Sequence, residues 1–558
     1  MENKTIARML RLLSQLMELH DENPFKIKSL VNAAYKIDKL PYPIAGKSLP
    51  EMEQIDGIGK STASKVWSLF TTNSIQELSD MIAKTPPGII EMMQIKGLGP
   101  KKIIVIWKNM QIETVGELYY ACNENRLIEA KGFGLKTQEE IKKIIEFNMA
   151  SNGRFLYARI EKFAENLLQS FKKEFKAELS FLTGQYRRRC EIIDSLDILT
   201  IIPFNEQFIA DLKNIGLSVI EYNKNTIECE TEYGIIVNVH FCEPDELGWQ
   251  LILQTGNKEH SDNLALKLVN KDILGKTEAG IYELAGIPFV EPEMREGNNE
   301  LELAINNRLP HLIEYSDLKG SLHNHSTWSD GVHTLEEMAI FCRDELKLEY
   351  LGICDHSKSA FYANGLNEIR VAAQQREIEE LNAKLQPFHI FKGIESDILY
   401  DGSLDYPDEI LSTFDFVVAS VHSILKMTEE KATERIIHAI ENPYTTILGH
   451  PTGRLLLSRS GYPIDHKKII DACAANKVII EVNANPLRLD LDWRWQQYAV
   501  EKGVLLSINP DAHRKEGLYD MHYGTLIARK GGVSKNNCLN AMDLQQVKLL
   551  FDQKKRRR

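Results

Sequence analysis

The second half of the chain concentrates histidine and carboxylate side chains that could bind metal ions. Eleven of the fifteen histidines lie after residue 320. Ligand sets of histidine and carboxylate without thiolate suit Zn²⁺, Mn²⁺ or Fe²⁺. Nine candidates exceed what one ion uses, so we expect two or three divalent ions. The candidate ligands are His323, His325, Asp330, His356, Glu395, His422, His450, Asp511 and His513.

Seven short β-rich runs alternate with helical segments after residue 318, and they position these side chains. The end of each run is accompanied by a metal-competent side chain at the same structural position, and the sixth run gives Glu481 and Asn483. Such alternation predicts a parallel sheet or barrel, in which the C-terminal strand ends converge on one small volume. Clustered ions in that place would suit the hydrolysis of phosphate esters. The runs span residues 318–322, 350–354, 389–394, 414–421, 446–449, 478–482 and 504–508.

The order of the motifs in this region resembles the PHP (polymerase and histidinol phosphatase) domain. The resemblance covers about residues 317–550 and implies a distorted (β/α)7 barrel that holds three metal ions on the nine ligands. Asp330 would then also count as catalytic. Arg454 and Lys358 lie beside ligands and could hold phosphate, although a solvated side chain explains each equally well. The motifs are His323-Asn-His325, Ser329-Asp-Gly331, Asp355-His-Ser357, Glu395, Ser420-Val-His-Ser423, Gly449-His-Pro-Thr-Gly-Arg454 and Asp511-Ala-His513.

Three segments in residues 1–150 repeat one design, with a Gly-x-Gly turn before a helix-compatible stretch. This is the helix-hairpin-helix pattern, in which the turn brings backbone N–H groups close to a DNA phosphate without reading bases. Lysines after the turns would add charge. The sequence therefore predicts an α-helical DNA-binding region. The expected contacts are Gly57, Gly59, Lys60, Gly97, Gly99, Lys101, Lys102, Gly132, Gly134 and Lys136.

The segment Thr183–Asp197 resembles the palm motif of family X DNA polymerases, an α+β nucleotidyltransferase fold. Together with the regions on either side, the chain resembles a bacterial family X polymerase with a C-terminal PHP domain. Members of that family hold two Mg²⁺ ions on three palm carboxylates. Here the three positions are Ser195, Asp197 and Asn238. Neutral Ser and Asn are poor ligands for Mg²⁺, so we expect polymerase activity to be lost or very weak.

The composition fits three or four domains in a reducing cytosol. The 558 residues exceed one core, the eight cysteines are scattered, and no long apolar run predicts a membrane span. We expect a helical DNA-binding region at 1–150, a degenerate palm and thumb at 151–312, and the PHP barrel with a basic tail at 313–558. The N-terminus lacks a signal-peptide pattern. We therefore expect a cytoplasmic, nucleoid-associated monomer that binds gapped, nicked or 3′ DNA ends.

The leading hypothesis is a metal-dependent 3′–5′ exonuclease of DNA repair. The alternatives are a small-molecule phosphatase of the histidinol-phosphate type, a gap-filling polymerase that is still active, and a non-catalytic DNA-binding scaffold. Lys65 aligns with the Schiff-base lysine of the family's lyase domain, although a surface lysine is the better interpretation. The run Lys554–Arg558 adds positive charge, and we expect it to be a disordered tail.

Overall fold

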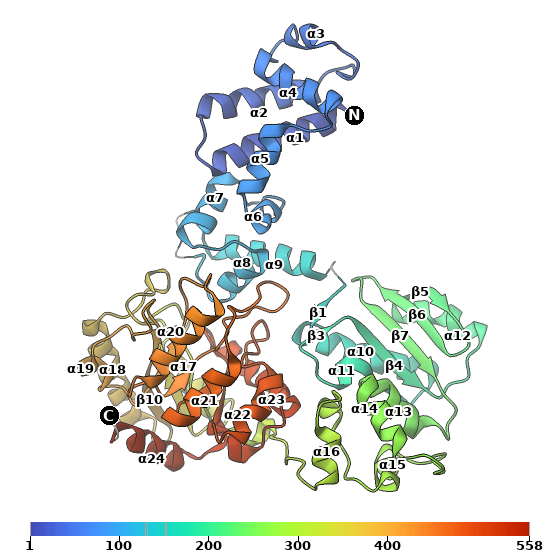
Figure 1. The fold of residues 1–558 in the computed structure, drawn as a ribbon, viewed down its shortest axis with the longest axis vertical. Coiled ribbons are helices and arrows are strands. Elements are labelled where there is room, and N and C mark those ends of the chain that lie inside the picture. The colour runs from blue at the N-terminus through green and yellow to red at the C-terminus, as the bar shows by residue number, and fades with distance from the viewer. Residues whose placement is uncertain (1, 129, 131, 151–152, 557–558) are drawn as a thin grey trace. The chain divides into compact units, whose positions relative to one another are not determined.

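The computed structural model describes residues 2–128, 130, 132–150 and 153–556. They form two compact units, Met1–Ile145 and Glu146–Arg558, which are considered one at a time (Figure 1). None of the helices in the described part of the chain is long and apolar enough to cross a membrane.

The first unit is entirely helical, and its turns follow from its glycines. The first glycine of each repeat adopts a left-handed backbone, with φ of +83° at Gly57, +94° at Gly97 and +93° at Gly132, which glycine adopts at no steric cost. A helix begins directly after the second glycine, as the repeats predict. The helices are α1 (Asn3–Leu19), α2 (Pro24–Asp38), α3 (Leu49–Glu53), α4 (Lys60–Thr71), α5 (Gln76–Lys84), α6 (Pro87–Met92), α7 (Pro100–Ile104), a π-helical turn Val105–Asn109, α8 (Val115–Asn123) and α9 (Leu135–Ala150).

The second unit begins with a mixed five-stranded sheet in the order β2-β4-β7-β6-β5. The central pair, β4 (Ser195–Thr200) and β7 (Ile236–Phe241), is parallel, and its register places Asp197 beside Asn238. Helix α10 (Tyr157–Phe175) packs its apolar side into the core of this sheet. The other strands of this sheet are β2 (Ser180–Leu182), β5 (Leu217–Tyr222) and β6 (Thr226–Thr231), whereas β1 (Phe155–Leu156) and β3 (Ile192–Ile193) form a separate antiparallel pair.

A group of short helices follows or flanks this sheet and completes the middle region. Its core is a separate apolar cluster around Ile252, Ile281 and Val290. The helices are α11 (Gly184–Arg187), α12 (Glu206–Asp211), α13 (Leu247–Thr255), α14 (Lys258–Leu266), α15 (Glu278–Ala285) and α16 (Glu300–Ile305).

The last part of the second unit is a seven-stranded, all-parallel sheet in the order β14-β13-β12-β11-β10-β9-β8. It is nearly closed into a barrel, because a parallel bridge between Asn324 and Ala512 joins the segments that follow the two edge strands. The predicted (β/α)7 architecture is thereby confirmed. The strands are β8 (Gly320–Ser321), β9 (Tyr350–Ile353), β10 (His389–Asp397), β11 (Phe416–Ser420), β12 (Ile447–Leu448), β13 (Ile479–Asn483) and β14 (Leu506–Asn509).

Helices follow the barrel strands and bury an apolar layer against them. A capping box opens α17, since the hydroxyl of Thr334 accepts from the backbone N–H of Glu337 and the carboxylate of Glu337 accepts from the backbone N–H of Thr334. The helices are α17 (Leu335–Asp344), α18 (Glu368–Lys384), α19 (Asp408–Leu411), α20 (Glu429–Glu441), α21 (His466–Asn476), α22 (Trp493–Glu501), α23 (Met521–Lys530) and α24 (Leu544–Lys555).

Helix α24 changes the interpretation of the basic C-terminal run. Lys554 donates to the backbone oxygens of Asn476 and Lys477, at 3.1 and 3.2 Å, and Lys555 pairs with Asp415 at 2.7 Å. These two lysines therefore belong to the barrel, because the helix extends further than the charge pattern suggested. Arg557 and Arg558 lie outside the described residues.

The mixed sheet and the barrel share a buried, charged interface within the second unit. The fully buried amine of Lys530 pairs with Glu296 and donates to the backbone oxygen of Arg188 at 3.0 Å. Arg188 in turn pairs with Glu296 at 2.9 Å, and the indole of Trp493 donates to Glu191. The expected boundary at residue 312 thus lies inside one compact unit.

Candidate metal centre

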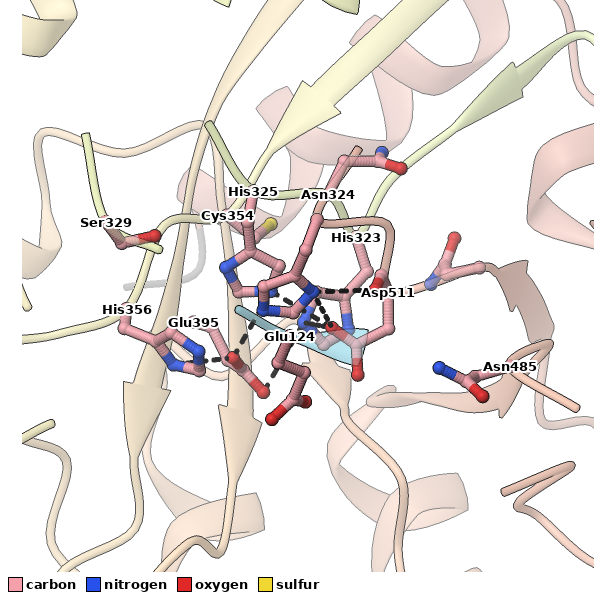
Figure 2. Close-up of polar contacts among 12 residues, drawn as sticks. Glu124, His323, Asn324, His325, Ser329, Cys354, His356, Glu395, Asn485 and Asp511 are labelled. Atoms are coloured by element: carbon pink, nitrogen blue, oxygen red, sulfur yellow. Dashed lines mark hydrogen bonds and ion pairs between the residues drawn. The ribbon is translucent and has the colours of Figure 1, made fainter. Parts of the chain in front are cut away.

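The barrel brings the predicted ligands together at the C-terminal ends of its strands. Figure 2 shows His323, His325, His356, Glu395 and Asp511 among them. His323 and His325 follow β8, His356 follows β9, and Glu395 lies near the end of β10. The remaining ligands follow β11, β12 and β14, apart from Asp330, which lies in the loop after β8. The convergence follows from parallel topology, because all C-terminal strand ends meet at one rim.

Three groups of side chains could each hold an ion. Within each group the potential ligand atoms lie within 4.8 Å of one another. His325 and His356 each belong to two groups, so the groups adjoin. His450, which is in none of them, places Nε2 3.1 Å from Oε1 of Glu395. The groups are His325, Asp330, His356 and His513; His323, His325 and Asp511; and His356, Glu395 and His422.

The cluster fits divalent cations because several of its buried ligand atoms make no hydrogen bond in the described part of the chain. Among the described residues, no hydrogen-bond partner meets Nε2 of His323, Nδ1 of His325 or Nδ1 of His450. The same holds for Oδ2 of Asp330 and Oε2 of Glu395. A buried polar atom without a partner costs free energy, and a bound cation would remove that cost. Nitrogen and carboxylate oxygen donors suit Zn²⁺, Mn²⁺ or Fe²⁺.

The electrostatics of the cluster divide its imidazoles into neutral and protonated ones. Burial lowers the pKa of His325 to about 4, assisted by the neighbouring His513 and His356, so His325 is a neutral ligand at pH 7. Burial also disfavours the charged form of His422, but Glu395 and Asp397 outweigh it and raise the pKa of His422 to about 10. Without a metal, a proton on His422 therefore balances the buried carboxylates.

Two further carboxylates hold ligands in place. Glu481 accepts from Nδ1 of His323 at 2.7 Å and from the backbone N–H of His450 at 2.8 Å, which turns Nε2 of His323 toward Glu395 and Asp511. Asp397 contacts Nδ1 of His422 at 2.5 Å. Such partners fix the tautomer and orientation of a ligating imidazole. Glu481 follows the strand-end pattern of the ligands, whereas Asp397 lies two residues beyond Glu395 and sequence reasoning missed it.

The two basic residues expected to bind phosphate are engaged elsewhere in the structure. Arg454 donates from Nε to the backbone oxygen of Arg488 at 2.8 Å and from its other nitrogens to Asp492 and the backbone of Leu489. These contacts make Arg454 a brace for the loop after β13. Nζ of Lys358 donates to Glu368 at 2.8 Å.

Arg488 is a cation beside the cluster that sequence reasoning did not single out. Its Nε lies 3.8 Å from Oδ2 of Asp511, on the loop that Arg454 braces. Its only sequence signal was the Asn-Pro-Leu-Arg turn after the sixth strand, which carries no metal-ligand pattern.

The palm-like sheet holds a very different arrangement at the positions that resemble a polymerase site. Strands β4 and β7 together contain one carboxylate, Asp197. Its Oδ1 accepts from the amide of Asn238 at 3.0 Å and lies 3.2 Å from Nε2 of His240. Its Oδ2 packs so closely on Gly184 that a Cβ there would approach to 2.3 Å. Protein groups thus contact both oxygens of Asp197.

The helix-hairpin-helix turns present their backbone to solvent. A Cβ added at Gly59, Gly99 or Gly134 would meet nothing within 4 Å. Gly59 and Gly99 are the N-cap residues of α4 and α7, so no N-cap side chain covers the first N–H groups of these helices. The first N–H groups of these helices can therefore meet a phosphate. Lys60, Lys101 and Lys136 are exposed beside them. By contrast, the lyase candidate Lys65 pairs with Glu77 at 2.9 Å and donates to Ser61 at 3.0 Å.

The fold and the site define a class of protein. A helix-hairpin-helix region and a palm-like mixed sheet precede a PHP-type barrel, which carries a buried, histidine-rich cluster able to bind metals. Two family models match the helical region: a helix-hairpin-helix domain matches residues 1–75, and a SAM-like helix-hairpin-helix tandem matches residues 89–146.

Comparison with known proteins gives the family. The chain is 34% identical to the DNA polymerase/3′-5′ exonuclease PolX of Bacillus subtilis (strain 168), over 98% of this chain and 99% of that protein. Its C-terminal part is 29% identical to a probable phosphatase of Thermoanaerobacter sp. (strain X514), over 32% of this chain and 75% of that protein. A probable phosphatase of Acetivibrio thermocellus is 31% identical over 34% of this chain and 78% of its own length. The chain belongs to the PolX family, the bacterial family X DNA polymerases with a C-terminal PHP domain.

Proposed function

We propose that this protein is a DNA-binding, metal-dependent phosphodiesterase that removes nucleotides from 3′ ends during DNA repair, and that its palm no longer supports polymerisation. The observation that carries the proposal is the buried cluster, in which several ligand atoms, among them Nε2 of His323 and Oε2 of Glu395, lack hydrogen-bond partners among the described residues. The helix-hairpin-helix turns supply the DNA affinity. The relative from Bacillus subtilis is named for a DNA polymerase activity and a 3′-5′ exonuclease activity.

Eight of the nine ligands fall into three adjoining groups, and His450 contacts Glu395 of the third, which supports three bound ions. When bound, such cations supply Lewis acidity toward phosphate oxygens and make water acidic enough to act as a nucleophile at neutral pH. The chain's own contribution is to fix the ligands. Glu481 and Asp397 orient imidazoles, and the bracing of Arg488 by Arg454 keeps a guanidinium beside Asp511 for a phosphate oxygen.

The test is hydrolysis of 5′-labelled DNA in the presence of Mn²⁺. We expect stepwise shortening from the 3′ end, and we expect no primer extension on gapped DNA with Mg²⁺ or Mn²⁺. Absence of mononucleotide release from single-stranded, recessed and gapped substrates would overturn the nuclease proposal. Robust extension that Asp197→Ala abolishes would overturn the proposed loss of polymerisation.

A small-molecule phosphatase is the second candidate, because the barrel alone is similar to probable phosphatases. A substrate of that kind needs no helix-hairpin-helix region. Turnover of histidinol phosphate or another phosphomonoester, together with no measurable DNA binding, would favour this candidate over the nuclease.

A further inference from the structure

Large apolar side chains are exposed around the rim that carries the metal ligands. After residue 312 the described structure has nine exposed large hydrophobic residues, and five of them lie between the end of a barrel strand and the next α-helix. Exposed apolar groups gathered on one face mark a binding surface rather than a stable packing arrangement. The five are Val332, Phe361, Tyr400, Ile424 and Tyr519.

Phe361 is the most exposed of these residues, with 89% of its surface open to solvent. Other apolar residues of the same loop are not exposed, since Ala360, Ala363 and Leu366 are fully buried. The loop therefore packs its small and aliphatic side chains inward and directs its one phenylalanine outward. Holding a phenyl ring in water forgoes the hydrophobic gain of burial, which favours a role for the ring with a ligand.

The loop that carries Phe361 is fixed at its base to the metal cluster. The ligand His356 accepts from the backbone N–H of Leu366 at 2.8 Å, and Ser357 and Leu366 form a parallel bridge. Gly365 donates to the backbone of Ala360 at 3.1 Å and has no room for a Cβ, which would lie 1.9 Å from the oxygen of Ser357. Hydrogen bonds thus join the two ends of this loop, and its first residue is the predicted metal ligand His356.

The neighbouring ring shows how close this loop comes to the reaction centre. The ring of Tyr362 lies edge-on to the imidazole of His356, with 6.2 Å between their centroids. Because Cα atoms of consecutive residues are about 3.8 Å apart, Phe361 stands on the rim beside that ligand. A DNA strand with a phosphodiester in the cluster must continue past this rim.

We propose that the loop of residues 356–366 is a nucleobase-binding subsite, in which an unpaired base upstream of the scissile phosphodiester stacks on Phe361. The proposal rests on the proposed nuclease function and names the part of the substrate that the rim recognises. Base stacking on an aromatic side chain suits a nuclease without sequence preference, because every base has a π-face. A sugar phosphate lacks such a face, so a sugar phosphatase would gain nothing from this ring.

The first experiment compares kinetics on a single-stranded oligonucleotide and on bis(p-nitrophenyl) phosphate. Phe361→Ala should raise KM for the oligonucleotide about 5- to 150-fold with kcat within about twofold, and Phe361→Trp should restore it. The ratio of kcat/KM for the oligonucleotide to that for the small diester should fall by the same factor. The matched control is Leu549→Ala, which removes an exposed side chain from α24 and should change neither value. An unchanged KM, or an equal loss on both substrates, would overturn the subsite.

The second experiment separates the subsite from the proposed function. The full-length protein is mixed with single strands whose terminal phosphodiester is a phosphorothioate, which slows hydrolysis. Each strand carries one fluorescent 2-aminopurine, at the second, third or fourth nucleotide from the 3′ end. Stacking should quench the fluorescence at one position in the wild type and not in Phe361→Ala. If the wild type hydrolyses only the small diester, the nuclease function fails, yet position-specific quenching lost in Phe361→Ala would still support the subsite. No quenching at any position would overturn it.

Discussion

The palm and the barrel of this chain both place polar side chains on parallel strands, yet they satisfy those side chains in opposite ways. In the palm, the oxygens of Asp197 are met by Asn238, His240 and the surface of Gly184. In the barrel, nitrogen and oxygen atoms of His323, Glu395 and other ligands are buried without hydrogen-bond partners among the described residues. The difference teaches that an arrangement able to hold cations leaves ligand atoms open, whereas the single carboxylate of β4 and β7 is enclosed by protein groups.

The same contrast extends to the arginines of the palm motif. Arg187 makes a bidentate pair with Glu278, and Arg188 pairs with Glu296, which also receives the buried Lys530 of the barrel. Arg188, in the segment that resembles the palm motif, thus helps to join the middle region to the barrel.

The largest effect should come from removing ligands. His323→Ala combined with His325→Ala should lower nuclease activity about 1,000-fold or more, because two of the three ligand groups lose members. Elemental analysis should show fewer ions per chain. Asp197→Ala, the matched change in the palm, should leave nuclease activity within about twofold. Equal losses from both variants would contradict the division of roles.

The second prediction concerns the interface of palm and barrel. Lys530→Met keeps the side-chain volume but removes a fully buried amine from Glu296 and from the backbone of Arg188. The free energy of unfolding should fall by about 3 kcal/mol, because buried acceptors lose their donor. Urea unfolding followed by tryptophan fluorescence measures it, since the amine lies 4.6 Å from the ring centroid of Trp493.

The control for this interface is Lys535→Met at an exposed position, which should change stability by less than about 0.5 kcal/mol. A loss no larger than that of the control would show that the palm does not support the barrel.

Local pattern and topology together made the barrel predictable. A chain in which strands alternate with helices can form few folds, chiefly those with a parallel sheet. In a parallel barrel the C-terminal ends of all strands lie at the same rim. His323 and Asp511 could therefore be assigned to one site although 188 positions separate their numbers. The helix-hairpin-helix turns were equally accessible, because Gly57 and Gly97 need backbone angles that glycine supplies.

Long side chains and domain contacts could not be predicted in the same way. Arg454 follows a ligand by four residues, but its direction depends on a loop more than thirty residues further on. Lys530 carries no sequence signal for its pairing with Glu296, 234 residues away. Such partners are set by tertiary packing, which spacing along the chain does not encode. The same reason hid Asp397 and the outward direction of Phe361.

The third prediction is a proton linkage of metal binding. Ligation needs a neutral imidazole, and His422, with a pKa of about 10, is protonated at pH 7 in the metal-free cluster. Metal affinity should therefore fall about tenfold for each pH unit between pH 9 and pH 7, per proton displaced. Calorimetry in buffers of different ionisation enthalpy would measure the release. Zero release at pH 7 would contradict it.

The metal-free protein should show the opposite dependence. A group whose pKa is raised from 6.5 to about 10 on folding stabilises the folded state fully below pH 6.5. That contribution is lost as pH rises toward 10. Without metal, the melting temperature should decrease between pH 7 and pH 10, and with saturating Mn²⁺ this decrease should be smaller. A metal-free protein that gains stability over this range would contradict the assignment.

The smallest effect should come from rebuilding the palm, and it tests the comparison most directly. Ser195→Asp with Asn238→Asp places two new carboxylates beside Asp197, since Ser195 is two residues away on β4 and Asn238 is paired with Asp197 across β7. In chelator the variant should lose about 1 kcal/mol of stability, because like charges adjoin. In a His323→Ala/His325→Ala background, millimolar Mg²⁺ should restore the melting temperature of the variant and not that of its parent. Restoration accompanied by primer extension would show that two substitutions account for the closed palm. If Mg²⁺ restores nothing, the contact between Asp197 and Gly184 excludes ions on its own, and the palm has diverged further than its missing carboxylates indicate.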